Sequence, residues 1–283
     1  MNAKILVCCH KKDVCATKEP YFPIHVGKAL HPEIDLGIQG DDDGDSISDK
    51  NGSYCELTGM YWAWKNLKNV DVIGLTHYRR YFDFHKQVRF GLPEKQIKST
   101  EFEKYNLDIP VQLINSLDER TVVVAKPRCY PVDVYTNYCL DHYSTDIKKL
   151  RHIVETNCEL KYRQAFKVIM HSCCLIHYNM FLMRWNQYEK YCEWLFNLLS
   201  IAEKDINIDF YDATQKRIYG YFAERLFNVY LLANSLHVKK YPILWFFDGS
   251  YPQYSALTNI LRNARNKFIN LLEHPKNLLI RNL

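Results

Sequence analysis

The stretch from Ser53 to Phe84 constrains the fold most, because it joins an amphipathic helix to a buried strand through a short turn. In its first half, mostly apolar residues recur at i, i+3, i+4, i+7 and i+8, which predicts one buried face of an α-helix. Ser53 and Glu56 have capping-box spacing, which predicts the start of this helix. Gly59 and Ala63, four residues apart, leave room for the helix to approach a sheet closely.

The second half of the stretch predicts a buried strand that ends in a functional cluster. Residues 70–75 (VDVIGL) are mostly apolar, as in strands that are covered on both faces. They run directly into residues 76–82 (THYRRYF), which are titratable and aromatic. Open α/β sheets bind ligands at the carboxyl ends of their strands. We therefore expect a binding site at His77 and the residues that follow it.

The remaining elements predict an α/β domain whose second half is rich in helices. Strands are expected at residues 4–10, 34–38, 121–127 and 172–183, and helices at 24–30, 145–157 and 216–235. Residues 83–120 suggest an insertion or a helical excursion over the sheet that adds no core element. Strands and helices alternate through the first 130 residues, and helices dominate the last 110.

Composition excludes several classes of protein. A net charge of +5 permits an anionic partner but falls short of a dedicated nucleic-acid binder. The ten cysteines form no C-x-x-C pair, so we interpret them as reduced, mostly buried thiols without a zinc site. Residues 1–11 lack a signal-peptide pattern, and no apolar run reaches membrane-spanning length, which predicts a cytoplasmic protein.

An acidic run, GDDDGDSIS at residues 40–48, has two interpretations. Its Asp-x-Asp spacing, Asp41 and Asp43, is that of carboxylates holding a divalent cation in many sugar-nucleotide enzymes. A solvated turn rich in aspartate is the favoured alternative, because turn residues flank the run and a helix start follows it.

Five segments together resemble a known family: Asn51, YCELTGMYWAWKN, HYRRYF, NMFLM and GYFAERLFNVYL. They are similar to bacterial polysaccharide-biosynthesis proteins classed as domain of unknown function 4422, found in capsule, exopolysaccharide and O-antigen clusters. The resemblance covers residues 3–250. It implies a nucleotide-sugar-dependent glycosyltransferase with a GT-A-like single α/β domain, over residues 1–254, and a mixed, mostly parallel sheet.

The chemistry of glycosyl transfer suggests roles for particular residues. Donor binding is expected from the two basic or aromatic strand ends: His10, His77, Tyr78, Arg79 and Arg80. Arginine's fork matches the oxygens of a diphosphate, and strand alternation predicts that only one of the two arginines meets it. Sugar or acceptor binding is expected from Trp62, Trp64 and Asn179, although tryptophans on such a helix are more often core residues.

Two further expectations concern the chemistry. Glu224, in GYFAERL, is the first candidate for the base that deprotonates the acceptor, with Asp42 second. Cationic side chains in HYRRYF take the place where a GT-A fold usually has its Asp-x-Asp pair. This arrangement favours metal-independent transfer, with Asp41 and Asp43 as fallback metal ligands.

The expected reaction moves galactofuranose or another hexose from a UDP-linked donor to a growing bacterial surface glycan, on a glycan or lipid-linked oligosaccharide acceptor. The competing hypothesis is a non-catalytic glycan- or phosphate-binding component of a polysaccharide assembly complex. Release of UDP from an activated sugar by the purified protein discriminates between the two.

Residues 255–283 form a basic tail with aliphatic residues at helical spacing, which suggests attachment to an anionic membrane surface. Packing on the protein's own core or on a second subunit is the alternative. Each basic residue near such a surface contributes about 1 kcal/mol. We therefore predict that deleting residues 256–283 abolishes co-sedimentation with anionic liposomes and leaves donor binding unchanged. A truncated protein that unfolds would instead place the tail in the fold.

Overall fold

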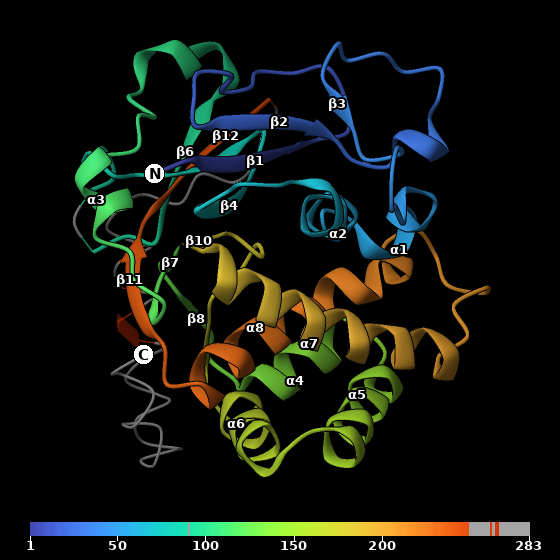
Figure 1. Ribbon diagram of the computed structural model, residues 1–283. Helices are drawn as coiled ribbons and strands as arrows, with labels where there is room; N and C mark the ends of the chain where they lie inside the picture. Colours follow the sequence, from blue (N-terminus) through green and yellow to red (C-terminus); the bar gives the residue numbers. More distant parts are fainter. Residues whose placement is uncertain (90, 249–260, 262–263, 266–283) are drawn as a thin grey trace.

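The computed structural model describes residues 1–89, 91–248, 261 and 264–265 (Figure 1). The strands are β1 Ala3–Cys9, β2 Tyr21–His25, β3 Gln39–Gly40, β4 Val72–His77, β5 Arg80–Phe82, β6 Glu94–Lys98, β7 Thr121–Ala125, β8 Arg128–Cys129, β9 Cys174–Leu175, β10 Phe181–Arg184, β11 His237–Tyr241 and β12 Ile243–Phe247. The helices are α1 Asn51–Tyr54, α2 Leu57–Asn66, α3 Val111–Asn115, α4 Val134–Asp141, α5 Ser144–Asn157, α6 Leu160–Met170, α7 Trp185–Asp205 and α8 Ile218–Ala233, with short 3₁₀ turns between them.

The main sheet is mixed and mostly parallel, as expected. Its strands follow the order β11-β7-β10-β4-β1-β2-β3, with β5, β12 and β6 branching from β4. β1 pairs in parallel with both β2 and β4, whereas β10 runs antiparallel between β4 and β7. The carboxyl ends of β1 and β4 therefore lie at the same edge of the sheet.

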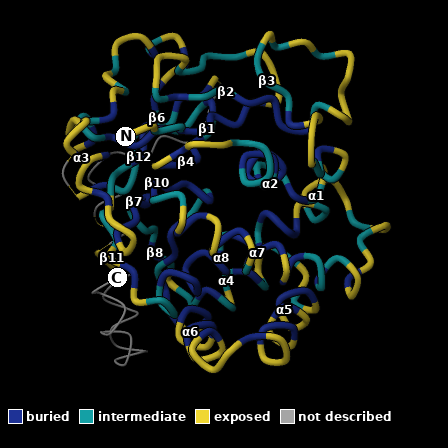
Figure 2. Tube along the Cα trace, in the orientation of Figure 1, coloured by how far each residue is buried: buried dark blue, intermediate teal, exposed yellow. Residues whose placement is uncertain are grey.

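Helices α4 to α8 gather on one side of the sheet, below it in the view of Figure 1. α7 packs against β4 and β10, and α8 packs between α6 and α7. α8 is buried along most of its length, whereas α5 and α6 expose one face (Figure 2). The apolar stripe expected on residues 216–235 is thus the centre of the helical layer.

The expected helix from Ser53 is divided in two. α1 ends at Tyr54 and α2 begins at Leu57, because Cys55 adopts a left-handed backbone with φ 54°. The capping-box prediction is wrong, since Ser53 lies inside α1 and donates to the Lys50 carbonyl at 3.2 Å. The divided helix leaves Glu56 at a bend between two elements.

Four other expectations about secondary structure need correction. The helix expected over 24–30 is replaced by the end of strand β2 and a 3₁₀ turn at Lys28–Leu30, and residues 34–38 form no strand. Proline is tolerated in β2 because β3 pairs only with Ile24 and His25, so the Pro23 nitrogen faces an unpaired edge. The excursion over 83–120 contributes β6 to the sheet. The strand expected over 172–183 is interrupted where Tyr178 and Asn179 have φ of 76° and 53°.

Two features of the C-terminal half were not expected. β11 and β12 follow α8 and return to the sheet. A disulfide joins Cys129 to Cys174 and links β8 to β9, so the prediction that all cysteines are reduced is wrong for this pair. The two cysteines are 45 residues apart, and no local pattern marks them.

The expected tail, residues 255–283, lies outside the described residues except at 261, 264 and 265, so its role stays a prediction. Within the described part of the chain, none of the helices combines the length and apolar character needed to cross a membrane.

The close approach expected at Gly59 gives a stability test. A Cβ at this position would lie 2.7 Å from Cγ1 of Val26, whose branched side chain has little freedom to move. We predict that Gly59→Ala lowers the free energy of unfolding by about 1–3 kcal/mol. The matched control is Gly52→Ala in α1, where a Cβ meets no atom within 4 Å. Urea unfolding should show the control within about 1 kcal/mol of the wild type, and equal effects of both variants would contradict the packing argument.

Candidate functional site

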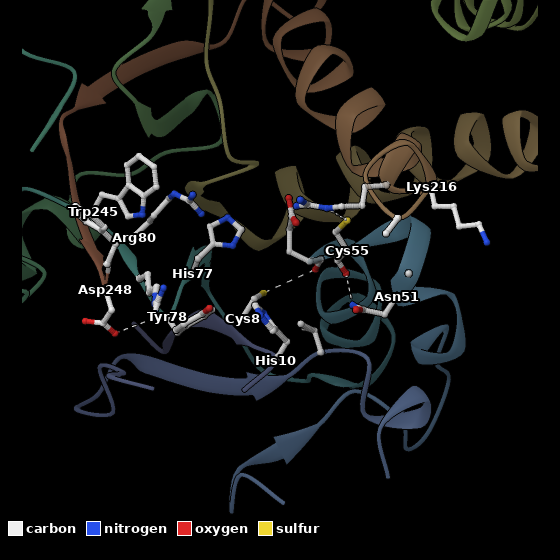
Figure 3. Close-up of a pocket in the computed structure, with 17 residues that line it drawn as sticks. Cys8, His10, Asn51, Cys55, His77, Tyr78, Arg80, Lys216, Trp245 and Asp248 are labelled. Atoms are coloured by element: carbon white, nitrogen blue, oxygen red, sulfur yellow. Dashed lines mark hydrogen bonds and ion pairs between the residues drawn. The ribbon is translucent and has the colours of Figure 1, made fainter. Parts of the chain in front are cut away.

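A cavity of about 670 Å³ lies at the carboxyl ends of β1 and β4, where the sequence predicts a site. Its wall combines the end of β1 (Cys8, His10), the β4–β5 turn (His77, Tyr78, Arg79, Arg80), the α1–α2 junction (Asn51, Gly52, Cys55, Glu56), the segment before α8 (Ala213, Lys216, Arg217), β12 with its end (Trp245, Phe247, Asp248), and Val26. Figure 3 places Trp245, Arg80 and Asp248 on one side, Cys55, Asn51 and Lys216 on the other, and His77 between them. All five expected donor-binding residues line this cavity.

The two arginines of HYRRYF have different surroundings. Arg79 lies in the turn between β4 and β5, and its Nε donates to Asp13 at 2.9 Å while Nη2 also approaches Asp248 at 3.2 Å. Arg80 begins β5, and its guanidinium carbon lies 4.7 Å from the ring centroids of both Tyr178 and Trp245. Among the described residues Arg80 has no ion-pair partner, and its buried Nε has no hydrogen-bond partner. Arg79 is thus neutralised within the protein, and Arg80 is not.

The other basic groups give the cavity a positive character. Lys216 and Arg217 come from the 3₁₀ turn Gln215–Arg217, and Nε of Arg217 donates to Sγ of Cys55 at 3.3 Å. Burial lowers the pKa of His10, and so do the charges of Lys11, Arg217 and Arg79. Burial also lowers the pKa of His77, although Glu56 opposes the shift. Both imidazoles are therefore neutral near pH 7.

The segment from His177 to Asn179, here called the 177–179 loop, connects the cavity to α8. The backbone carbonyl of Tyr178 accepts a hydrogen bond from Nε2 of His77 at 2.8 Å. The Tyr178 hydroxyl donates to Glu94 at 2.9 Å, and its ring contacts Arg80. One residue of this loop thus contacts two residues of HYRRYF.

Glu224 lies behind this loop and does not line the cavity. Its Oε1 accepts from the Tyr178 amide at 2.8 Å, and its Oε2 lies 3.3 Å from both Nδ1 of His177 and Nη1 of Arg225. Burial alone would raise the pKa of Glu224, but His177, Arg225 and the amide outweigh it and hold the pKa at about 2. The carboxylate is fully occupied as an anchor, and its expected role as base stays a prediction.

The residues expected to bind sugar lie elsewhere. Trp62 is buried, stacks on Phe22 and donates its indole N–H to Asp43 at 2.5 Å. Trp64 stacks on Phe196 outside the cavity. Asn179 is buried behind the cavity wall and donates to Oε1 of Glu56 at 2.7 Å. An aromatic face toward the cavity comes instead from Trp245, a residue that no local sequence pattern marked.

The fallback metal ligands are used for structure. The carboxylate of Asp41 is buried and accepts from the amides of Gly27 and Lys28 and from the Ser48 hydroxyl. Asp43 accepts from Trp62 and from Gln39 at 3.1 Å. Neither lines the cavity, and Asp42 is exposed. The acidic run thus serves as a hydrogen-bonded turn, and metal-independent transfer stays a prediction.

The low pKa of Glu224 predicts acid-dependent stability. A carboxyl whose pKa falls on folding from 4.5 to about 2 stabilises the protein above pH 4.5, and this contribution is lost as the pH falls toward 2. We predict that Glu224→Gln lowers the free energy of unfolding by up to about 3 kcal/mol at pH 7, and by much less at pH 3. Urea unfolding at both pH values tests this.

The control is Glu155→Gln, which removes the exposed i,i+4 partner of Arg151 and should change stability by less than about 0.5 kcal/mol. A Glu224→Gln effect of equal size at pH 7 and pH 3 would contradict the anchoring role.

Comparisons with known proteins agree with this architecture. Among solved structures, the apo structure of the bifunctional glycosyltransferase WbbM matches with a TM-score of 0.77 and 30% sequence identity. The match covers 90% of this chain and 48% of that chain, so this chain spans about half the length of WbbM. The likeness confirms the expected GT-A-like α/β fold. A comparison with curated proteins finds no match.

The family is settled by a match that covers most of the chain. The model of the domain of unknown function DUF4422 matches residues 4–235, a region that contains the motifs in which the resemblance was found. The chain therefore belongs to the DUF4422 family.

Proposed function

We propose that this protein is a glycosyltransferase that moves a sugar from a nucleotide-sugar donor to a glycan acceptor in the cavity at the ends of β1 and β4. The likeness to WbbM supports the reaction class. For the donor we propose a UDP-linked hexose, with galactofuranose among the candidates. For the acceptor we propose a growing bacterial surface glycan, free or lipid-linked, at the cytoplasmic face of a membrane.

The observation that carries the proposal is the state of Arg80. Its guanidinium carbon lies 4.7 Å from the centroids of two aromatic rings, and it has no ion-pair partner among the described residues. A partly buried charge without a counterion is costly, which favours an anionic ligand at this position. Arginine binds phosphate oxygens through two parallel N–H groups, and the two rings hold its plane in place.

The charges around the cavity fit the needs of glycosyl transfer. The departing nucleoside diphosphate must be stabilised as negative charge develops on it. Four cationic side chains and two carboxylates line the cavity, and one of those carboxylates is already paired with Arg79. The cavity therefore offers an excess of positive charge to a diphosphate.

The test is a panel of nucleotide sugars with the purified full-length protein. Thermal stabilisation reports binding, and a donor at about a hundred times its dissociation constant should add roughly 2.7 kcal/mol to the free energy of unfolding. Release of UDP from UDP-galactose, UDP-galactofuranose, UDP-glucose and UDP-N-acetylglucosamine reports turnover. Stabilisation without UDP release from any donor, even with a glycan acceptor, would indicate a binding protein instead.

The two arginines provide an internal comparison. We predict that Arg80→Gln weakens UDP binding about tenfold to a hundredfold, because a charge-assisted hydrogen bond contributes about 1.5–3 kcal/mol. Arg79→Gln should affect UDP affinity less and stability more, because it removes the guanidinium partner of the largely buried Asp13 and leaves that carboxylate with Lys11 at 3.6 Å. Titration calorimetry with UDP and thermal unfolding measure both effects. Unchanged UDP affinity in Arg80→Gln would rule out a diphosphate contact.

A further inference from the structure

Two carboxylates line the cavity, Glu56 and Asp248, and their surroundings differ. Asp248 is 61% exposed and lies 3.2 Å from Nη2 of Arg79. Glu56 accepts one side-chain hydrogen bond, from the neutral amide of Asn179 to Oε1. Its second oxygen, Oε2, has no hydrogen-bond partner among the described residues. Glu56 thus combines one anchored oxygen with one that is available to a ligand in the cavity.

The backbone places Glu56 at the bend between α1 and α2. Cys55 has φ 54°, an unfavourable conformation for a residue with a side chain. The amide of Asn51 stabilises the bend by donating to the Cys55 carbonyl at 2.7 Å and to Oγ1 of Thr58 at 2.9 Å. Without the bend, one continuous helix would run through Glu56. The strained turn at Cys55 therefore places the Glu56 carboxylate at the cavity wall.

Asn179 is held equally firmly. Its side chain is buried, and its Nδ2 donates to Glu56 at 2.7 Å and to the Gly220 carbonyl at 3.3 Å. Its Oδ1 has no hydrogen-bond partner in the part of the chain that the structure describes, and both Tyr178 and Asn179 have positive φ. Each such feature is unfavourable by itself, and strain of this kind concentrates at functional sites. The buried side chain and the unusual backbone of Asn179 together place its Nδ2 within hydrogen-bond distance of Glu56.

We propose that Glu56 is the catalytic base of the transfer and that Asn179 is the residue that positions it; this inference rests on the proposed function. The acceptor hydroxyl gives its proton to the Glu56 carboxylate. The acceptor oxygen forms a bond to the anomeric carbon, and the bond from that carbon to the diphosphate oxygen breaks. The electron pair leaves with the nucleoside diphosphate, and Glu56 later releases the proton to water.

The other groups in or near the cavity are less suited to this role. Burial and the nearby Glu56 raise the pKa of the Cys55 thiol to about 11, so it stays protonated. Nε2 of His77 must carry a proton to donate to the Tyr178 carbonyl, which leaves only Nδ1 to accept one. Glu224 has no position on the cavity wall and already has three partners. Glu56 is the carboxylate that both lines the cavity and keeps one oxygen without a hydrogen-bond partner among the described residues.

The test compares Glu56→Gln with the wild type on the UDP-sugar that the wild type turns over. General base catalysis contributes about 10²–10⁴-fold, so we expect UDP release to fall at least a hundredfold. Affinity for UDP, measured by calorimetry, should change less than threefold because the amide keeps the shape of the side chain. The matched control is Glu203→Gln, which removes a carboxylate that binds Lys50 and Tyr54 outside the cavity and should retain turnover within twofold.

Positioning is tested with Asn179→Ala and Glu56→Asp. Both keep a carboxylate but displace it, so we expect each to lower kcat at least tenfold with UDP affinity within threefold. A purely structural role of Asn179 would lower the melting temperature and leave kcat per folded molecule unchanged. Should Glu56→Gln fail to fold, Glu56→Asp carries the test, and wild-type kcat in that variant would overturn the proposal.

Failure of the inference and failure of the proposed function are distinguishable. If the wild type turns over no nucleotide sugar, the proposed function fails. If the wild type is active and Glu56→Gln keeps more than a tenth of its rate, the inference about Glu56 fails. Loss of turnover in Glu224→Gln, with melting temperature and UDP affinity intact and Glu56→Gln active, would assign the base to Glu224. If His77→Asn loses turnover with its melting temperature and UDP affinity intact while Glu56→Gln stays active, the base is His77.

Discussion

The hydrogen bond from the Tyr178 amide to Glu224 is the constraint on which the candidate site depends. It fixes the 177–179 loop against α8, in a left-handed conformation that the loop would not adopt by itself. From that loop the Tyr178 carbonyl orients His77, the Tyr178 ring supports Arg80, and the Asn179 amide holds Glu56. A buried carboxylate with no contact to the cavity thus determines the geometry of several residues within it.

The same loop is restrained from its other side. The hydroxyl of Tyr130 lies 2.7 Å from Nε2 of His177, and Nδ1 of His177 lies 3.3 Å from Glu224. Burial lowers the pKa of His177, so the neutral ring accepts from Tyr130 and donates to Glu224. The disulfide joins Cys129, which precedes Tyr130, to Cys174, which lies three residues before His177. Covalent and hydrogen-bonded links therefore meet at one short segment, which suits a site that must hold charged groups at fixed distances.

Sequence reasoning worked where the signal is local. The periodicity and apolar runs that specify β1, β4, β7, α5 and α8 lie within single segments, and all five are present. The expected strand ends at His77 in HYRRYF, and the five residues expected to bind the donor line one cavity, while their role in donor binding stays a prediction. These inferences needed no contact between distant parts of the chain.

The other features of the site depend on contacts between distant segments, which no local sequence pattern predicts. Trp245 meets Arg80 only because β12 pairs with β5, across more than 160 residues. The capping-box pattern at Ser53 concealed the bend that exposes Glu56, because the spacing is the same in both arrangements. Strand alternation suggested opposite directions for Arg79 and Arg80, but the tight β4–β5 turn directs both to the cavity. The two arginines differ in their ion pairs, because Asp13 and Asp248 contact Arg79 and neither contacts Arg80.

The return of β12 to the sheet has a consequence for where this domain can be divided. The family match ends at residue 235, within the segment that follows α8. Trp245, Phe247 and Asp248, which lie beyond that point, form one wall of the cavity. During synthesis, the ribosome must release residues close to 248 before the cavity can close. A fragment cut at the edge of the family match would retain HYRRYF, Glu56 and Glu224 and still lack a complete binding site.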